Sequence, residues 1–182
     1  MAPMVKPLHD ELGLRSEFMM TMHAYTNDRQ LTDSYQSDRY RSRSAIHSMI
    51  TTKISAASAI AKVLQELTSK LNGSAVQVPT INISLVDLTF NASRETRIEE
   101  VNQLLKSAAA TDLYAVLDHC DEPLKSSDFH HSSYSCNFDA TQKFVNGSLS
   151  KITTWYDCEW GGSNRLLDSA LALANSDTGA LA

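Results

Sequence analysis

Apolar and polar positions follow one another along this chain in patterns that predict both helices and strands. Residues 1–12 show the spacing of a short amphipathic helix that ends at Gly13 and has no polar residue to cap its start. Residues 18–25 alternate between an apolar face and a second face that includes His23, which predicts a strand. The polar stretch 27–44 has no period and predicts a long loop, which compact domains usually keep for function.

The rest of the chain continues this mixture of patterns. A helix is predicted over 55–67, where apolar residues share one face, and another helix begins at the capping box 96–99. Ser163 is expected to cap a final helix that ends near residue 174. Asn146-Gly147 is a strong signal for a hairpin turn. The remaining predicted strands are 74–81, 83–91, 114–117, 132–138, 141–145 and 150–157.

The order of these elements indicates the fold class. Strands and helices are mixed without strict alternation, and no Gly-x-Gly-x-x-Gly motif marks a dinucleotide-binding turn. The predicted class is therefore α+β, with a mostly antiparallel sheet that helices cover on one face. A length of 182 residues suits one domain with its own core.

Composition places the chain among ordinary globular proteins, with 42% apolar and 20% charged residues. The net charge of −5 argues against a protein that binds nucleic acid through bulk positive charge. No apolar run approaches the roughly 18 residues of a membrane span. The three cysteines lack metal-ligand spacing, so we expect a reduced, cytoplasmic protein with no metal, nucleic-acid or membrane partner.

Seven short segments occur in an order that resembles the catalytic domain of phosphorylating glyceraldehyde-3-phosphate dehydrogenases. The segments are 2–10 (APMVKPLHD), 23–28 (HAYTND), 78–82 (VPTIN), 86–89 (VDLT), 127–129 (SDF), 138–140 (FDA) and 155–161 (WYDCEWG). Each is short, but the ordered set, which extends to about residue 174, is specific for that family. The blocks around Asn82 and Asp87 also resemble the related erythrose-4-phosphate dehydrogenases.

This resemblance implies a homotetrameric, NAD-dependent oxidoreductase of glycolysis. In that family a cysteine thiolate attacks an aldehyde, the hemithioacetal gives a hydride to NAD, and inorganic phosphate cleaves the thioester. The implied substrates are a sugar-phosphate aldehyde and inorganic phosphate, and the implied partners are further copies of the chain or a paralogue.

Four residues match positions of the family's catalytic and phosphate sites. His23 matches the general base, which polarises the cysteine and handles protons. Thr26 matches a ligand of the substrate phosphate, and Arg41 matches an arginine of the phosphate region. Gln77 stands where the family has an arginine, so a charge-assisted anchor worth roughly 1.5–3 kcal/mol is lost.

Four further positions depart from the family pattern. Ile54-Ser55 replaces the Thr-Gly that closes a phosphate pocket, although the Ser55 hydroxyl could substitute in part. Cys158 replaces the asparagine that contacts the nicotinamide amide, and Gly162 replaces an aromatic residue near the cofactor. Together these changes indicate relaxed constraint on phosphate and cofactor binding.

The family's nucleophilic cysteine and its NAD-binding domain both precede the position held here by Met1. The chain by itself is therefore predicted to be a truncated enzyme that is inactive and does not bind NAD. Among the cysteines, only Cys158 maps near the nicotinamide pocket, and a packing role is favoured over a catalytic one because free cysteines are usually small buried residues. Cys120 and Cys136 match no site and are interpreted as packing residues.

The predicted organisation is one catalytic domain over 1–175, with a long loop at 27–52 and a tail at 176–182. One hypothesis for its function is an aldehyde dehydrogenase that continues upstream of Met1. The alternative is a non-catalytic remnant, which is either silent or an interaction module that pairs with a full-length paralogue. For the enzyme, an erythrose-4-phosphate dehydrogenase origin is the alternative to the glyceraldehyde-3-phosphate enzyme.

Overall fold

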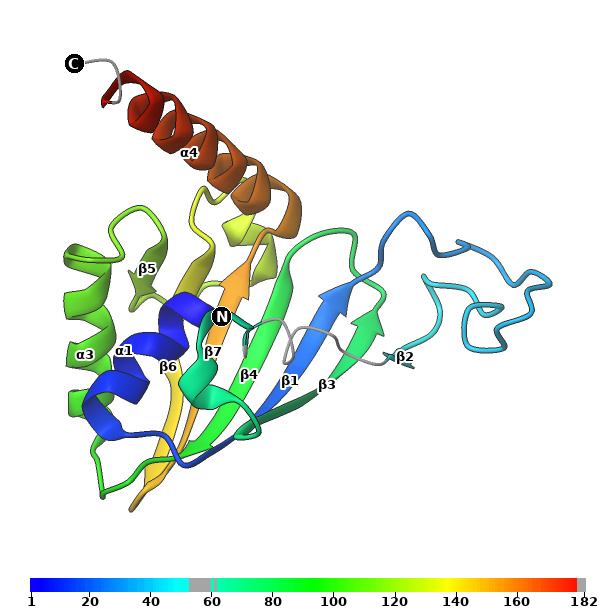
Figure 1. The fold of residues 1–182 in the computed structure, drawn as a ribbon. Coiled ribbons are helices and arrows are strands. Elements are labelled where there is room, and N and C mark those ends of the chain that lie inside the picture. Colours follow the sequence, from blue (N-terminus) through cyan, green and yellow to red (C-terminus); the bar gives the residue numbers. More distant parts are fainter. Residues whose placement is uncertain (53–59, 61, 180–182) are drawn as a thin grey trace.

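The computed structural model of the chain describes residues 1–52, 60 and 62–179 (Figure 1). Its helices and strands follow in the order α1 (Ala2–Leu12), β1 (Ser16–Ala24), β2 (Ile50–Thr52), η1 (Gln65–Leu67), β3 (Leu71–Val78), β4 (Ser84–Asn91), α3 (Ile98–Ala110), β5 (Leu117–Cys120), η2 (Ser126–Phe129), β6 (Cys136–Asn146), β7 (Leu149–Tyr156) and α4 (Cys158–Gly179). The elements η1 and η2 are short 3-10 helices.

The strands of the described residues form one seven-stranded sheet in the order β2-β3-β1-β4-β7-β6-β5. The predicted α+β class is confirmed, and the sheet is mixed: β1 with β3 and β5 with β6 are parallel, whereas the other pairs are antiparallel. Because β1 and β3 run in the same direction, their carboxyl ends meet at one edge of the sheet, where His23 pairs with Gln77.

Helix α1 lies on one face of the sheet, and α3 packs beside α1 and against β5 and β6 (Figure 1). Strand β1 alternates as predicted, but the expected apolar face is not the one that the core covers: Phe18 is 52% exposed, whereas Met19 and Thr21 on the face of His23 are buried. Burying each large apolar side chain contributes about 1.5–3 kcal/mol. The largest fully buried side chains are Phe90, Phe138, Met4, Leu8, Leu12, Leu14, Met19, Leu67, Leu88, Leu105, Leu117 and Ile152.

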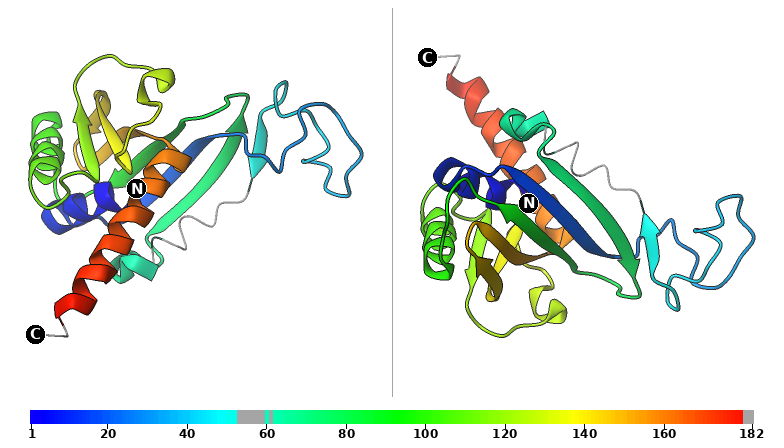
Figure 2. Two further views of the ribbon diagram at one scale, coloured as in Figure 1. Left: turned by 90° about the horizontal axis from the view of Figure 1, so that it is seen from above. Right: turned by 90° about the horizontal axis from the view of Figure 1, so that it is seen from below.

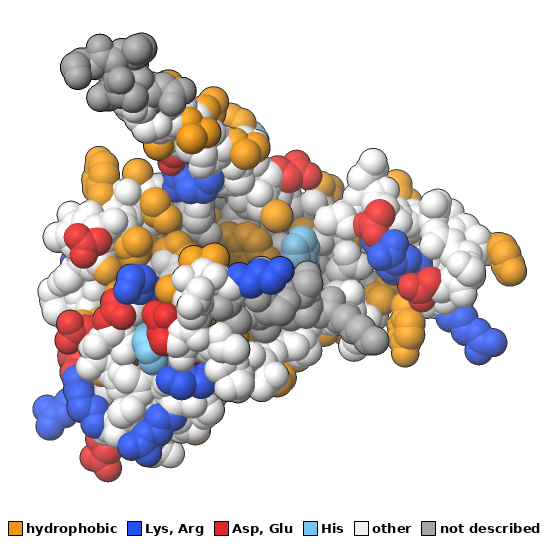
Figure 3. Space-filling model, viewed as in Figure 1, with side chains coloured by type: hydrophobic (Ala, Val, Ile, Leu, Met, Phe, Trp, Pro, Cys, Tyr) orange, Lys and Arg blue, Asp and Glu red, His pale blue; other side chains and the backbone are white. Residues whose placement is uncertain are grey.

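Two long segments leave this core in different directions. The loop between β1 and β2 extends from the β2 edge of the sheet, and α4 projects from the end of β7 (Figures 1 and 2). Helix α4, on which hydrophobic side chains gather at the surface (Figure 3), exposes four leucines that are each at least 64% exposed: Leu166, Leu167, Leu171 and Leu173.

The structure confirms the two turns that depend on glycine. Gly13 ends α1 with φ 63°, where a Cβ would also lie 2.8 Å from the Ser93 hydroxyl. Gly147 adopts φ 62° in the turn between β6 and β7. Both are left-handed conformations that glycine adopts without steric cost.

Two predicted strand boundaries are wrong because a neighbouring backbone conformation overrides the local pattern. The strand expected over 114–117 lies at Leu117–Cys120, since Ala115 has φ 64° in a preceding turn. The strands expected over 132–138 and 141–145 are one strand, β6, with a bulge between Asp139 and Lys143. The helix expected over 55–67 lies mostly outside the described residues, and its end forms η1.

Both predicted helix caps are also wrong. Arg97 rather than Thr96 precedes α3, and the Thr96 hydroxyl donates to the Glu100 carboxylate instead of capping the helix. Ser163 lies inside α4, where its hydroxyl donates to the carbonyl of Glu159. The described part of the expected tail continues as helix to Gly179.

Asp157, and not Ser163, lies at the start of α4 and directly precedes its first residue. Its side chain is a buried carboxylate that accepts four hydrogen bonds. Oδ1 accepts the backbone N–H groups of Glu159 (3.2 Å) and Trp160 (2.9 Å). Oδ2 accepts from the Asn82 amide (3.0 Å) and the His131 backbone N–H (3.1 Å). Burial opposes the charge of Asp157, but these hydrogen bonds outweigh it and lower the pKa of the carboxyl. One residue therefore ties α4 to the segments before β4 and after η2.

We predict that Asp157→Ala lowers the free energy of unfolding by about 2–4 kcal/mol, because it leaves four donors without their acceptor. Urea denaturation measures this change. The control is Asp168→Ala, which removes an exposed ion pair with Arg165 on the same helix and is expected to cost less than about 1 kcal/mol. Equal effects of the two variants would contradict the anchoring role of Asp157.

Glu17 is a second buried carboxyl group that affects the stability of the fold. Its side chain is 4% exposed, and neither carboxyl oxygen has a hydrogen-bond partner. Burial raises the pKa of Glu17 to about 7, although the charge of Lys70 lowers it in part. The folded state therefore holds a proton at pH values where the unfolded chain has lost it.

This shift predicts that stability falls as pH rises from about 4.3, the ordinary glutamate value, to about 7. Glu17→Gln should remove this part of the pH dependence and stabilise the protein by roughly 1–2 kcal/mol at about pH 8, with no gain at about pH 4. Denaturation across this pH range is the measurement, and the exposed Glu11→Gln serves as the control. An unchanged pH profile in Glu17→Gln would refute the assignment.

Candidate functional site

His23 lies at the carboxyl end of β1, where three other elements meet. Gln77 of β3 is its strand partner. The backbone N–H of Ala24 donates to the Ser84 hydroxyl at the start of β4 (3.1 Å), and Ser84 pairs with Tyr156 of β7. The Tyr156 ring stands edge-on to the imidazole with centroids 6.2 Å apart. Strand register therefore places His23 in a cluster of polar groups at one edge of the sheet.

The backbone fixes the tautomer of His23. Its Nδ1 lies 2.7 Å from the carbonyl oxygen of Ala24. A carbonyl can only accept a hydrogen bond, so Nδ1 carries the hydrogen and Nε2 of the neutral ring is the acceptor. A histidine held in this way can take a proton from a neighbour and return it.

Cys158 is the neighbour that hydrogen-bonds to this imidazole. It is the first residue of α4 and is exposed, so the expectation of a small buried packing residue is wrong at this position. The hydrogen bond with Cys158 raises the pKa of His23, burial lowers it in part, and the Ala24 carbonyl raises it further. The sequence pointed to His23 and to Cys158 separately. Their proximity depends on α4 beginning directly after Asp157, which no local pattern predicted.

Tyr156 is the uncharged neighbour of His23 in this cluster. Burial raises its pKa to about 12, against the Ser84 hydrogen bond, which lowers it. The phenol therefore stays protonated at neutral pH and adds no charge beside His23.

Thr26 and Arg41, the expected phosphate ligands, meet at the carboxylate of Asp28. The Thr26 hydroxyl donates to Oδ1 of Asp28, and a guanidinium nitrogen of Arg41 lies 3.1 Å from Oδ2. Arg41 also lies 3.6 Å from a carboxylate oxygen of Asp38. These ion pairs are about half exposed and contribute at most about 1 kcal/mol, so an anion can compete with them.

Arg41 lines a hollow of about 500 Å³ between the long loop and β2. Arg29, which sequence analysis did not identify, lines it too and is only 7% exposed. One terminal nitrogen of Arg29 donates to the carbonyl of Tyr40 (3.0 Å), whereas its Nε is buried without a hydrogen-bond partner. Two arginines, one with a free buried donor, suit an anion. The hollow adjoins β2, which pairs with β3 at Gln77 and so lies two strands from His23.

The remaining predicted positions fall elsewhere. Ile54 and Ser55 lie outside the described residues. A Cβ at Gly162 would meet no atom within 4 Å. Cys136 is buried beside the Thr154 hydroxyl, and burial raises its pKa, which fits the packing interpretation. Cys120 is partly exposed, and its thiol donates to the carbonyl of Glu122.

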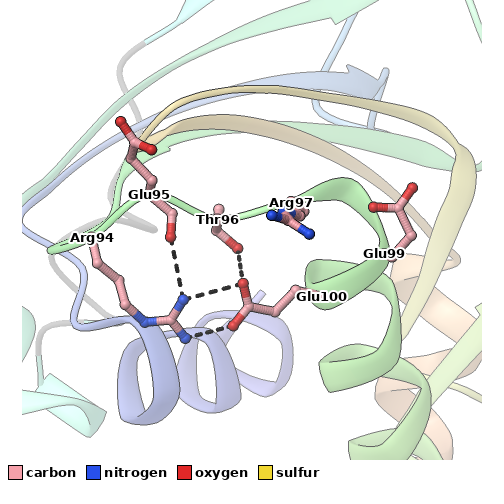
Figure 4. Close-up of a pocket in the computed structure, with 6 residues that line it drawn as sticks. All are labelled: Arg94, Glu95, Thr96, Arg97, Glu99 and Glu100. Carbon is pink, nitrogen blue, oxygen red and sulfur yellow. Dashed lines mark hydrogen bonds and ion pairs between the residues drawn. The ribbon is translucent and has the colours of Figure 1, made fainter.

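A second hollow, of about 750 Å³, lies at the start of α3, beyond the other end of β4 (Figure 4). Three of its lining residues bond to one another. Arg94 donates to both carboxylate oxygens of Glu100, and Thr96 donates to the same carboxylate (Figure 4). These bonds lower the pKa of Glu100 to about 2. Such mutual bonds indicate a structural role for Arg94, Thr96 and Glu100.

Two properties of the described residues bear on the class of site, namely their helices and their possible metal ligands. No helix in this part of the chain combines the length and apolar character needed to cross a bilayer. Within the same residues, no group of three or more His, Cys, Asp or Glu side chains converges as metal ligands would.

The fold and the site define an α+β domain with a half-buried histidine at a sheet edge and a hollow lined by two arginines nearby. The sequence profile described as "Glyceraldehyde 3-phosphate dehydrogenase, C-terminal domain" matches residues 1–158. The chain belongs to the glyceraldehyde-3-phosphate dehydrogenase family and corresponds to its C-terminal domain.

Individual relatives agree with this assignment. The chain is 55% identical to the chromosomal glyceraldehyde-3-phosphate dehydrogenase of Cupriavidus necator over 97% of its length and 52% of the relative. It is 53% identical to the Pseudomonas aeruginosa enzyme, with 96% and 52% covered. For glyceraldehyde-3-phosphate dehydrogenase 1 of Bacillus subtilis the identity is 44%, again with 96% and 52% covered. The chain thus spans about half the length of these relatives.

The contact between Cys158 and His23 predicts a change in titration. We expect Cys158→Ala to lower the pKa of His23 toward its ordinary value of about 6.5, because the variant removes the hydrogen bond that contributes most to the raised value. The raised pKa stabilises the folded state below about pH 6.5, and this contribution is lost as pH rises through the folded-state value.

NMR titration of the imidazole signals measures this effect. Cys120→Ala is the matched control, because Cys120 contacts the carbonyl of Glu122 rather than His23. A His23 titration curve that is identical in the wild type and in Cys158→Ala would show that the two side chains do not interact in solution.

Proposed function

We propose that this chain is the catalytic half of an NAD-dependent, phosphorylating glyceraldehyde-3-phosphate dehydrogenase in which His23 is the general base. The hydrogen bond from Nδ1 of His23 to the Ala24 carbonyl carries the proposal, because it leaves Nε2 as a proton acceptor. Membership of the family supports it, as does the cationic hollow nearby. The three free cysteines suit the reducing cytoplasm.

In this proposal His23 performs proton transfer. Its Nε2 accepts the proton of a nucleophilic thiol, and the imidazolium then donates that proton to the oxygen that develops negative charge on the substrate. The neutral phenol of Tyr156 orients the ring without competing for the proton. The Ala24 carbonyl stabilises the imidazolium, because its acceptor faces the hydrogen on Nδ1.

Anion binding falls to the loop between β1 and β2. When phosphate binds, Arg41 and Thr26 release the carboxylate of Asp28 and bond to the phosphate oxygens instead. The buried Nε of Arg29 supplies a further donor in the hollow beside Arg41. Gln77 contributes hydrogen bonds without charge. Phosphate affinity should therefore be lower than in a site with an arginine at that position.

The cofactor of the family, NAD, fits the described residues poorly. Cys158 holds the position expected near the nicotinamide, and a thiol is a weak donor and a weak acceptor where a carboxamide needs stronger partners. NAD would supply the hydride acceptor when bound. We propose that the chain by itself neither binds it nor reduces it.

A first experiment tests the anion site alone. We predict that Asp28→Asn strengthens the binding of inorganic phosphate several-fold, because it removes the carboxylate that competes for Arg41 and Thr26. Arg41→Gln should weaken binding about tenfold or more. Isothermal titration calorimetry measures both affinities, and Asp168→Asn on α4 is the control. Phosphate affinities that are the same in all variants would contradict the proposed site.

A second experiment tests the general base. The upstream half of the Cupriavidus necator relative is joined to this chain, and NAD reduction with glyceraldehyde 3-phosphate is followed. We expect activity in this chimera, no activity in the chain alone, and a loss of about 10²–10⁴-fold in kcat for the chimera with His23→Gln. A higher rate with erythrose 4-phosphate would instead favour that sister activity. Full activity in His23→Gln would exclude His23 as the base.

One observation favours a second candidate function, a non-catalytic module that pairs with a full-length relative. The leucines of α4 are exposed, and an apolar surface of this kind favours association. An inactive chimera, together with co-purification of this chain with a full-length relative, would favour the module over the enzyme.

A further inference from the structure

Arg29 differs from the other arginines of the long loop in being buried without a carboxylate partner. Its side chain is 7% exposed, and within the described residues no acidic group lies close enough to it for an ion pair. By contrast, Arg41 pairs with two carboxylates, and Arg43 pairs with Asp33 at 2.7 Å. Arg39 is exposed, so water compensates its charge. A buried charge without a counter-ion is costly, and a bound anion removes that cost.

The guanidinium of Arg29 has donors left for such an anion. Its backbone N–H donates to the Thr26 carbonyl (3.0 Å) and its Nη2 donates to the Tyr40 carbonyl (3.0 Å), so two parts of the loop hold the residue in place. Its Nε is buried and has no hydrogen-bond partner. An Nε–H and a terminal N–H of one guanidinium form a fork that matches two oxygens of a phosphate. The Arg29 side chain is therefore preorganised for an oxyanion.

The hollow beside β2 provides the space for this ligand. Its volume is about 500 Å³, within the range of about 300–1,000 Å³ that is typical of small-molecule sites. The hollow is lined by Arg29, Asp38, Tyr40, Arg41 and residues 50–52. Ile50 and Tyr40 add apolar surface beside the two arginines. The hollow therefore suits a phosphate group that is either free or carried by a short carbon chain.

Arg41 is the weaker anion ligand of the two, because carboxylates already hold it. A guanidinium nitrogen lies 3.1 Å from Oδ2 of Asp28, and its Nε lies 3.6 Å from Oδ2 of Asp38. Asp38 is itself fixed, since its Oδ1 accepts the N–H of Tyr40 (2.9 Å). An anion has to displace carboxylates to reach Arg41, whereas no described carboxylate pairs with Arg29. Arg29 should therefore contribute more to the affinity for an anion.

We propose that Arg29 is the principal ligand of this hollow and determines its affinity for a phosphate group, free or as a monoester. The proposal rests on the anion site of the proposed function and names the residue that dominates it. The phosphate supplies the counter-ion that Arg29 lacks, and the Nε–H and a terminal N–H donate to two of its oxygens. Arg41 adds to binding only after it releases Asp28.

The experiment titrates the full chain with inorganic phosphate and with glycerol 3-phosphate in a calorimeter, and the tighter ligand shows which source of phosphate the hollow prefers. Arg29→Gln should weaken binding by about 100-fold, more than Arg41→Gln does. Arg29→Lys keeps the charge without the fork, so its affinity should lie between those of the wild type and Arg29→Gln. Arg43→Gln is the matched control, because Arg43 lies on the same loop but pairs with Asp33 outside the hollow. Far-UV circular dichroism checks the fold of each variant.

A double variant separates a direct ligand from a residue that only positions Arg41 through the Tyr40 carbonyl. Asp28→Asn should still strengthen binding several-fold in the Arg29→Gln background, because the carboxylate of Asp28 competes for Arg41 and not for Arg29. Loss of that gain would show that Arg29 acts through Arg41, and it would overturn the proposal.

An unchanged phosphate affinity in Arg29→Gln, or in Arg29→Lys where the glutamine variant does not fold, would also overturn it. If Arg41→Gln weakens binding in that case, the anion site of the proposed function stands and only the role of Arg29 fails. A wild-type chain that binds neither ligand would contradict both this proposal and that anion site. The role of His23 is tested separately by the chimera.

Discussion

The carboxylate of Asp157 is the constraint on which the site depends. It accepts two backbone N–H groups from the first turn of α4, one from the segment after η2 and one amide from Asn82. A buried charge is stable only when its oxygens are hydrogen-bonded, and here four donors meet that need. By fixing where α4 begins, Asp157 places Cys158 beside His23.

The sheet supplies the second half of this arrangement. Both backbone groups of Ala24 form hydrogen bonds: its N–H donates to the Ser84 hydroxyl of β4, and its carbonyl accepts from Nδ1 of the His23 ring. The imidazole is thus oriented by the backbone of the strand that carries it. The anion-binding region depends less on the sheet, because its charged groups lie on the long loop and pair with nearby acidic residues such as Asp28.

The elements that local sequence predicted well have local physical causes. Helix α1 ends at Gly13 and the last hairpin turns at Gly147, because both positions need a positive φ that glycine adopts freely. The predicted caps failed because other bonds replaced them. Asp157, which also bonds to the distant Asn82 and His131, caps α4 in place of Ser163. The Thr96 hydroxyl bonds to the carboxylate of Glu100, four residues further along the chain, instead of capping α3.

The sequence by itself determined the α+β class, the family, and His23, Thr26 and Arg41 as candidate site residues. These follow from periodicity and from ordered motifs. Only the tertiary structure decided that Cys158 is exposed and contacts His23, that Asp28 joins Thr26 to Arg41, and that Arg29 is buried with a free donor. Such contacts join groups whose separation is set by strand register and by loop path, and no local pattern of residues encodes those distances.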